Sequence, residues 1–297
     1  MGLLTHSIYE IWASFLIYSF CGWLMETVLV SYKEKKFVNR GFLNGPFCPI
    51  YGVGMIGISL VCSPFLGNYL VLFLLGMMTA TTVEYLTAWL LELLFDATWW
   101  DYSQKKFNIK GRVCLSVSLF WGILAVLFIS FVQPAVFSFL SRISTIYLEY
   151  FFYLSLLIFM TDVIFSVVAA AKLTTRIKAM FEQMPDFRDL MQVAREVDYF
   201  GLFDFKESTF SFRSFLSTIK DTTTELKENL TTLLPIERFK ELTENYFDKI
   251  EKTIRTFTSN YSSGENRLIK AFPNIKFKKI RQYLSDLDKK DDKNEQK

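Results

Sequence analysis

The sequence predicts an all-α protein: a polytopic membrane helix bundle of five spans, N-terminus outside, with a helical cytoplasmic C-terminal tail. Two features predict this class. The composition is apolar, with 51% hydrophobic and 17% aromatic residues and a mean hydropathy of +0.24, which is typical of a membrane protein rather than a soluble domain. The charges are also uneven, because residues 1–171 hold only 18 of the 63 charged side chains. We therefore expect a transmembrane domain over residues 1–171 and a cytoplasmic tail over residues 172–297.

A spanning helix needs roughly 20 mostly apolar residues. The chain contains five such stretches, at Ile8–Tyr32, Cys48–Leu66, Asn68–Phe95, Val113–Val132 and Ile146–Ala171. The first is not expected to be a signal peptide, because it lacks a basic start and a small-residue cleavage site and carries Glu26.

Basic residues between the spans predict the orientation. They gather in three places, after the first span (Lys33, Lys35, Lys36, Arg40), after the third (Lys105, Lys106, Lys110, Arg112) and after the fifth (Lys172, Arg176, Lys178). Basic loops face the cytoplasm. Five spans place all three groups on that side, so we expect the N-terminus outside and the tail inside the cell, in the cytoplasmic membrane.

The tail shows a helical pattern from Arg213 to about Ser259, where apolar positions recur at helical spacing. Pro235 is expected to kink or break this helix. The patch Phe277–Arg281 mixes basic and apolar residues and predicts either a solvated helix in a small bundle or a contact with an anionic leaflet. Residues Asp286–Lys297 are polar and predict a frayed end.

Several functional classes are disfavoured. A net charge of +3 with no long basic stretch argues against nucleic acid binding. Four cysteines without a Cys-x-x-Cys pair, and a single histidine, predict neither a disulfide framework nor a metal site. No P-loop, Gly-x-Ser-x-Gly or His-Glu-x-x-His motif occurs, so no cofactor is expected and a transport component is favoured over an enzyme.

Two segments on the predicted cytoplasmic side depart from plain membrane sequence. Asn39–Gly54 carries two prolines and four glycines where the chain enters the membrane, with Pro49 placed to begin a helix. It predicts either an anion site at a helix start, next to Arg40, or a re-entrant turn. Trp99–Arg112 offers Asp101, Asn108 and Arg112, which either fix a loop or contact a polar ligand.

Acidic residues inside the spans are candidates for function, because a charge at the bilayer centre costs about 2.5–3.5 kcal/mol on insertion scales. Glu84 and Asp162 lie deep in the third and fifth predicted spans, and Glu26 lies closer to the cytoplasmic end of the first. No Lys or Arg lies at their depth, so nearby Thr, Tyr or Asn groups, water or a shared proton are the expected partners. Hydrogen-bonded contact between helices is the alternative role.

These motifs resemble the CmpB-like family, described as ABC-transporter permeases of type IV. The resemblance rests on Tyr18–Trp23 with Glu26, Asn39–Leu43, Gly45-Pro46, Cys48–Gly52, Glu84-Tyr85, Trp100–Ser103, Phe107–Ile109 and Gly111-Arg112. It covers most of residues 8–130, and Asn266–Pro273 is similar to a C-terminal element of the family. The resemblance implies functional roles for Glu26, Asn39, Arg40, Tyr51, Glu84, Asp101, Tyr102, Asn108 and Arg112.

Three functions follow as hypotheses. The first is a permease component with a polar pocket facing the cytoplasm, a separate ATPase subunit as partner and an unknown substrate. The second is a membrane-embedded enzyme or binding protein for an anionic lipid or lipid-linked substrate, and the third is a scaffold or sensor whose tail binds a partner. The expected pocket consists of Glu26, Asn39, Arg40, Asn44, Tyr51, Glu84, Trp100, Asp101, Tyr102, Asn108 and Arg112, with Glu84 and Asp162 as intramembrane acids.

Overall fold

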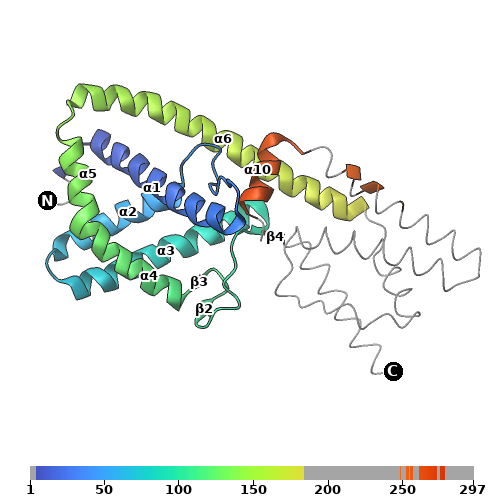
Figure 1. The fold of residues 1–297 in the computed structure, drawn as a ribbon, viewed down its shortest axis with the longest axis horizontal. Coiled ribbons are helices and arrows are strands. Elements are labelled where there is room, and N and C mark those ends of the chain that lie inside the picture. Colours follow the sequence, from blue (N-terminus) through green and yellow to red (C-terminus); the bar gives the residue numbers. More distant parts are fainter. Residues whose placement is uncertain are drawn as a thin grey trace, which may run out of the picture. The chain divides into compact units, whose positions relative to one another are not determined.

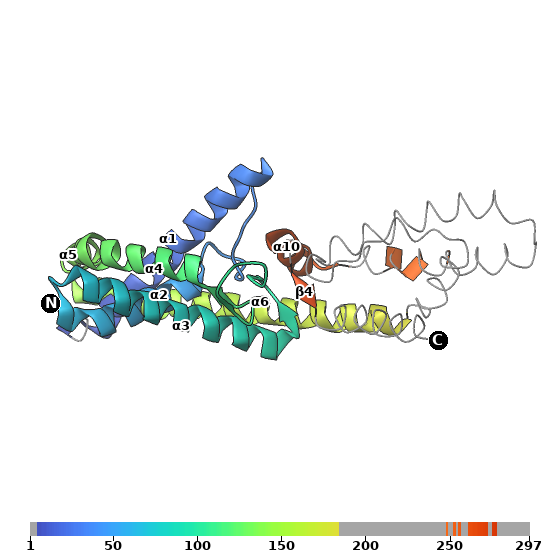
Figure 2. The same ribbon diagram turned by 90° about the horizontal axis from the view of Figure 1, so that it is seen from below.

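The computed structural model describes residues 5–183, 248, 252–253, 255–256, 261–272 and 275–277 (Figure 1 and, turned by 90°, Figure 2). The described chain is mostly helical and forms two compact units. Unit 1 comprises residues 1–93 and 100–168, and unit 2 comprises residues 94–99 and 169–297. Most of the predicted amphipathic helix at 213–259, and the predictions for Pro235, Lys278–Arg281 and Asp286–Lys297, lie outside the described residues.

Four helices are long and apolar enough to cross a membrane. They are α1 (Ile8–Glu34), α3 (Tyr69–Phe95), the continuous run Leu115–Leu140, and α6 (Thr145–Gln183), of which Thr145–Met180 forms the candidate span. α1 begins with a capping box, in which Ser7 and Glu10 each accept a hydrogen bond from the other's backbone N–H. The predicted boundary at residue 171 lies inside α6.

The predicted second span differs from these four. It forms α2 (Pro49–Cys62) and a short 3₁₀ turn, η2 (Ser63–Phe65), and α2 begins at Pro49 as the sequence predicts. Seventeen residues extend about 25 Å, which is less than the ~30 Å thickness of a hydrocarbon core. Pro64 in η2 limits the helix, because proline lacks the N–H that would continue the hydrogen-bond pattern.

The run Leu115–Leu140 contains a π-helical insertion. α4 (Leu115–Leu127) passes into the π segment Phe128–Val132, labelled η3, and then into α5 (Gln133–Leu140). Pro134 is the second residue of α5. It has no N–H to donate, and in a regular α-helix its ring would crowd the carbonyl four residues earlier. The wider π turn accommodates this proline without ending the helix.

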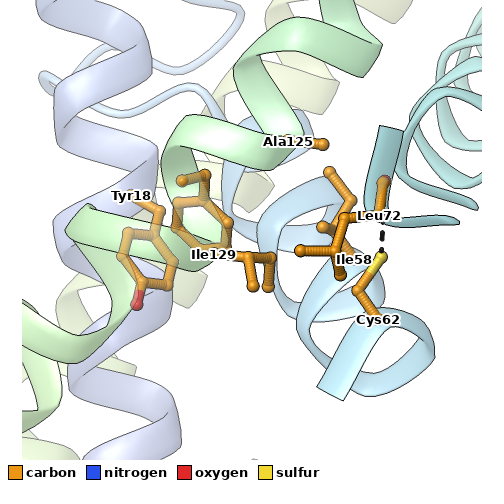
Figure 3. Close-up of a cluster of buried hydrophobic side chains, with 7 residues drawn as sticks. Tyr18, Ile58, Cys62, Leu72, Ala125 and Ile129 are labelled. Carbon is orange, nitrogen blue, oxygen red and sulfur yellow. Dashed lines mark hydrogen bonds between the residues drawn. The ribbon is translucent and has the colours of Figure 1, made fainter. Parts of the chain in front are cut away.

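The interior of unit 1 is a layer of closely packed apolar side chains (Figure 3). Tyr18 of α1 packs edge-on against Phe128 at a ring-centroid distance of 4.9 Å. The same cluster contains Ile58, Cys62, Leu72, Ala125 and Ile129. Lipid supplies no hydrophobic driving force between helices, so close packing has to hold them together. Gly76 and Ala125 show how close α3 and α4 come, because a Cβ built on Gly76 would lie 2.2 Å from the Ala125 Cβ.

Two short antiparallel ladders modify the predicted all-α class. In unit 1, β2 (Asn108–Ile109) pairs with β3 (Val113–Cys114), which makes a hairpin before α4. In unit 2, β1 (Ala97–Thr98) pairs with β4 (Lys276–Phe277). Neither ladder was predicted, because two-residue strands are too short to show alternation.

Unit 2 is held by side chains as well as by its ladder. α10 (Ser263–Ala271) starts with a second capping box, from Ser262 and Glu265. Glu265 is fully buried and forms an ion pair with Arg176 of α6 at 3.4 Å. Thr174 donates a hydrogen bond of 3.0 Å to the carbonyl of Phe95.

Candidate functional site

The first part of the site lies between α1 and the start of α2. The Tyr51 hydroxyl donates a hydrogen bond of 2.8 Å to Oε1 of Glu26. Arg40 places its Nε 3.6 Å from the other carboxylate oxygen of Glu26. Glu26 therefore has a neutral donor on one oxygen and a cation near the other.

A glycine permits this contact. A Cβ built on Gly22 of α1 would lie 2.2 Å from Cγ of Tyr51. Real Cβ atoms do not approach so closely, so any side chain at position 22 would push the Tyr51 ring away. Small residues let helices approach in this way, and here the close approach brings Tyr51 to Glu26.

The segment Asn39–Gly54 turns back into the bundle before α2 begins. The N–H of Cys48 donates to the carbonyl of Ser19 at 2.9 Å, and Ser19 lies 15 residues before the end of α1 at Glu34. Fifteen helical residues rise about 22 Å, so the segment has returned far along α1 at this point. The geometry is that of the re-entrant turn, one of the two structures that this segment predicts.

Backbone groups of a re-entrant segment need partners within the protein. Asp162 of α6 supplies two, accepting the N–H of Asn44 at 2.9 Å and the N–H of Gly45 at 2.8 Å. The Asn44 side chain donates to Asp162 at 3.0 Å and to Ser166 at 3.0 Å. Asp162 thus fastens the segment to α6 within unit 1, in a contact between a helix and a loop rather than between two helices.

Asn39 also holds the segment in place. Its side-chain oxygen accepts hydrogen bonds from the Trp23 indole at 2.7 Å and the Gly41 N–H at 3.2 Å, and its amide donates to the Asn44 carbonyl at 2.9 Å. The side chains of Asn39 and Asn44 therefore hold the loop together and attach it to α1 and α6. Their predicted role as ligand contacts stays a prediction.

The second part of the site surrounds Glu84 on α3, which is only 7% exposed. The Tyr102 hydroxyl donates to Oε1 of Glu84 at 3.2 Å, and the Trp121 indole of α4 donates to Oε2 at 3.2 Å. A tyrosine partner fits the sequence expectation. Thr82, a threonine partner expected from the sequence, instead donates its hydroxyl to a carbonyl of its own helix. Trp121 was missed, since it lies 37 residues away in sequence and no local pattern links it to Glu84.

The two parts meet at their aromatic side chains. The rings of Tyr51 and Trp121 lie edge to face with centroids 5.7 Å apart. Burial and the Glu84 carboxylate raise the pKa of Tyr102, and Glu26 contributes to the same shift. Tyr102 therefore remains a neutral hydrogen-bond donor. We refer to Glu26, Tyr51, Glu84, Tyr102 and Trp121 as the polar cluster.

Arg112 fixes the connection between α3 and α4 next to the polar cluster. Its Nε and Nη2 lie 3.2 and 2.7 Å from Oε2 of Glu92, and its Nη1 donates to the Tyr85 hydroxyl at 2.8 Å. The hydrogen bond to Glu92 raises the pKa of this guanidinium. The sequence offered Arg112 as a pocket residue but did not identify Glu92 and Tyr85 as its partners, although both share one helix face at a spacing of seven residues.

The remaining predicted residues of this segment build the β2–β3 hairpin. Asp101 accepts the Ser103 N–H at 2.8 Å, and the Trp100 indole donates to the Arg112 carbonyl at 3.0 Å. Asn108 donates to the carbonyls of Ser103 and Lys105 and accepts the Gly111 N–H. These are contacts of a fixed loop, the first of the two roles that the sequence predicts.

Across the described residues, no three His, Cys, Asp or Glu side chains converge as a metal ion would require. The polar cluster instead gathers two carboxylates and three aromatic hydrogen-bond donors from α1, α2, α3, α4 and the α3–α4 connection. Such a set can accept or release a proton and can hold a cationic or hydrogen-bonding group.

Comparison with known proteins gives one finding. A family described as "Putative ABC-transporter type IV" matches residues 13–167, more than half of the chain. The chain belongs to this family. No curated protein and no solved structure matches it.

The type IV match and the four apolar helices together make the chain a multi-pass membrane protein of an ABC-transporter family. The match extends beyond the resemblance at residues 8–130 and includes Asp162, which that resemblance left out. The polar cluster, the segment Asn39–Gly54 and the α3–α4 connection lie inside the matched residues, whereas Asn266–Pro273 lies outside them.

Proposed function

We propose that the chain is the membrane-spanning subunit of a transporter, with the polar cluster as the polar part of its translocation pathway. In this proposal the chain crosses the cytoplasmic membrane five times, with α2 as the second crossing, the N-terminus outside and the tail in the cytoplasm. A separate subunit supplies ATP hydrolysis and docks on the basic connections and the tail.

The observation that carries the proposal is the convergence of Glu26 and Glu84 from two different helices. Acidic side chains within spanning helices are costly and mark substrate, ion or proton pathways by default. Here both carboxylates lie among neighbouring helices, and hydrogen bonds from Tyr51, Tyr102 and Trp121 orient them. A polar interior at this depth supports a transport pathway.

The geometry gives less support to an anionic lipid as the substrate. That hypothesis rests on Arg40, Lys105, Lys110 and Arg112 as phosphate ligands, of which the two arginines have the geometry best suited to phosphate. Arg40 faces Glu26 at 3.6 Å and Arg112 faces Glu92 at 2.7 Å, so each arginine is next to an acid that offsets its charge. An enzyme of this kind would use Glu84 or Asp101 as its acid or base, and Asp101 accepts a backbone N–H in a turn.

The test compares two carboxyl-to-amide variants in a strain that lacks the chromosomal gene. Glu84→Gln removes a charge from the polar cluster, and Glu34→Gln removes one from the end of α1 as a matched control. We expect the metabolite profile of the Glu84→Gln strain to resemble that of the deletion strain, and the profile of the Glu34→Gln strain to resemble that of wild type. An ATPase should copurify with the wild-type protein and with both variants. A wild-type profile for Glu84→Gln, or no copurified ATPase, would contradict the proposal.

A further inference from the structure

The β2–β3 hairpin presents an unusual outer surface. Phe107 is 78% exposed and Ile109 58% exposed, although neither residue belongs to a spanning helix. Around them stand three exposed lysines, Lys105, Lys106 and Lys110, none of which forms an ion pair within the described residues. The exposed segment 105–110, referred to below as the tip, therefore combines two exposed apolar side chains with three positive charges that no ion pair in the described part of the chain offsets.

The backbone holds this tip in a fixed shape. Phe107 has φ of 53° and Lys110 has φ of 52°, a left-handed conformation that is rare for a bulky aromatic residue. The Phe107 carbonyl accepts the Leu115 N–H at 3.2 Å, and the Ile109 carbonyl accepts the Arg112 N–H at 3.1 Å. Strained residues persist where the surroundings hold them, often at functional sites, and a fixed tip loses little freedom on binding.

In the proposed topology, the hairpin also lies where the helices leave the bilayer. It connects α3 with α4, both part of candidate spans, and Arg112, in the turn between β2 and β3, contacts Glu92 near the end of α3. Figure 1 shows β2 and β3 beside the start of α4, at the edge of unit 1. Lipid headgroups are therefore the nearest large partner for side chains at the tip.

We propose that the β2–β3 hairpin is an interfacial anchor that binds anionic phospholipid. Phe107 and Ile109 enter the boundary between headgroups and acyl chains, and the three lysines bind headgroup phosphates. Apolar groups flanked by lysine suit this interface, and the cytoplasmic leaflet carries the negative charge that attracts them. The proposal uses the cytoplasmic orientation given above but does not require the chain to transport a solute.

The anchor would be connected to the polar cluster. Arg112 lies in the turn between β2 and β3 and contacts Glu92. Tyr102 donates its N–H to the Gly111 carbonyl of the same turn and its hydroxyl to Glu84. A hairpin drawn toward the headgroups would therefore pull on two contacts of α3. In this way the composition of the inner leaflet would bias the state of the cluster.

The first experiment measures the depth of the tip in the full-length protein. Cys21 is exposed and the other three cysteines are buried, so Cys21→Ser gives a background in which Ile109→Cys or Gln104→Cys carries a nitroxide. In nanodiscs that contain phosphatidylglycerol, we expect the label at 109 to be reached better by oxygen than by a polar nickel complex. The label at 104, also exposed, should favour the nickel complex. Equal access of the nickel complex to both labels would overturn the proposal.

The second experiment measures the charge preference. Lys105, Lys106 and Lys110 are replaced together by Gln, and the control replaces Lys33, Lys35 and Lys36 of the other basic connection. All six are exposed or half-exposed, so both variants should fold, which circular dichroism checks. We expect the preference for phosphatidylglycerol over phosphatidylcholine, measured by lipid exchange, to fall about tenfold or more in the first variant only.

An unchanged lipid preference in the hairpin variant would overturn the proposal, and so would an equal loss in both variants. Either result would leave the proposed transport function intact, because that function is tested at Glu84. Conversely, a wild-type metabolite profile for Glu84→Gln would leave the anchor intact.

Discussion

The hydroxyl of Tyr102 donates a hydrogen bond to Glu84 across 3.2 Å, joining the α3–α4 connection to the inside of α3. Glu84 lies eleven residues before the end of α3 at Phe95, a rise of about 16 Å. The connection therefore folds back along the helix that it follows. The segment before α2 does the same along α1, so two loops reach into the bundle from the same end.

Replacing Tyr102 by Phe should destabilise the folded protein, because the change leaves a carboxylate oxygen of Glu84 without its donor. Leaving a buried acceptor without its donor costs about 1–3 kcal/mol. Thermal unfolding in detergent would measure the loss. Tyr32→Phe is the matched control, since Tyr32 is 88% exposed. Equal melting temperatures for the two variants would show that the bond contributes nothing.

The same tyrosine predicts a dependence on alkaline pH. The folded pKa of Tyr102 is raised by burial and by Glu84, whereas the unfolded value is about 10. The folded state holds this proton more tightly, so the stabilisation is complete below about pH 10 and is lost as the pH rises toward the folded pKa. Wild type should therefore lose more stability than Tyr102→Phe between neutral and strongly alkaline pH, and parallel pH curves would contradict this.

Arg112→Lys should weaken the protein even though the positive charge remains. A guanidinium can reach Glu92 with two nitrogens and Tyr85 with a third, and an ammonium group cannot reproduce that planar geometry. We expect a loss of about 2–3 kcal/mol. A cycle with Glu92→Gln would show coupling if the pair acts as a unit. Additive losses would argue that the two residues act independently.

Asp162→Ala should loosen the segment before α2, because two backbone N–H groups and the Asn44 amide lose their acceptor. Cys48 lies buried in this segment, so its maleimide labelling should become faster in a Cys21→Ser background. Thr161→Ala is the control, since the Thr161 hydroxyl bonds only within its own helix. Unchanged labelling of Cys48 in Asp162→Ala would rule out the anchoring role.

Gly22→Ala and Gly54→Ala should have opposite effects. A Cβ at Gly54 meets nothing within 4 Å, so alanine there should stabilise the helix by about 0.5–1 kcal/mol. A Cβ at Gly22 meets the Tyr51 ring, so alanine there should destabilise the protein and weaken the contact of Tyr51 with Glu26. Melting temperatures compare the two variants directly, and the idea fails if both rise.

The long helices could be predicted from the sequence, because extended apolar runs report membrane helices directly. Four of the five predicted stretches match long apolar helices within a few residues at most ends, although Leu115–Leu140 and α6 extend beyond the predicted ends. α2 is shorter than expected. Hydropathy counts the apolar residues of a segment, but it does not show that the chain re-enters the bundle before the helix starts.

The site could be predicted only in part. The depth of the acidic residues singled out Glu26, Glu84 and Asp162, but their partners come from other helices and from the connections, and depend on packing. Tyr102 meets Glu84 across 18 residues and Asn44 meets Asp162 across 118. Arg112 carried no visible sign that Glu92 would be its partner, because their contact depends on how far the connection folds back.

The pairing of β1 with β4 has a practical consequence for dividing the chain. Unit 2 draws its residues from the end of α3, from α6 and from the segment 261–277, where Phe272 packs on Trp99 with centroids 4.8 Å apart. Truncation of the chain after α6 would remove Phe272 from the Trp99 indole and would leave β1 without its paired strand β4. Expression trials that aim at a minimal membrane fragment should therefore retain the polypeptide through Phe277, and a reporter fused within 184–247 would be tethered on both sides.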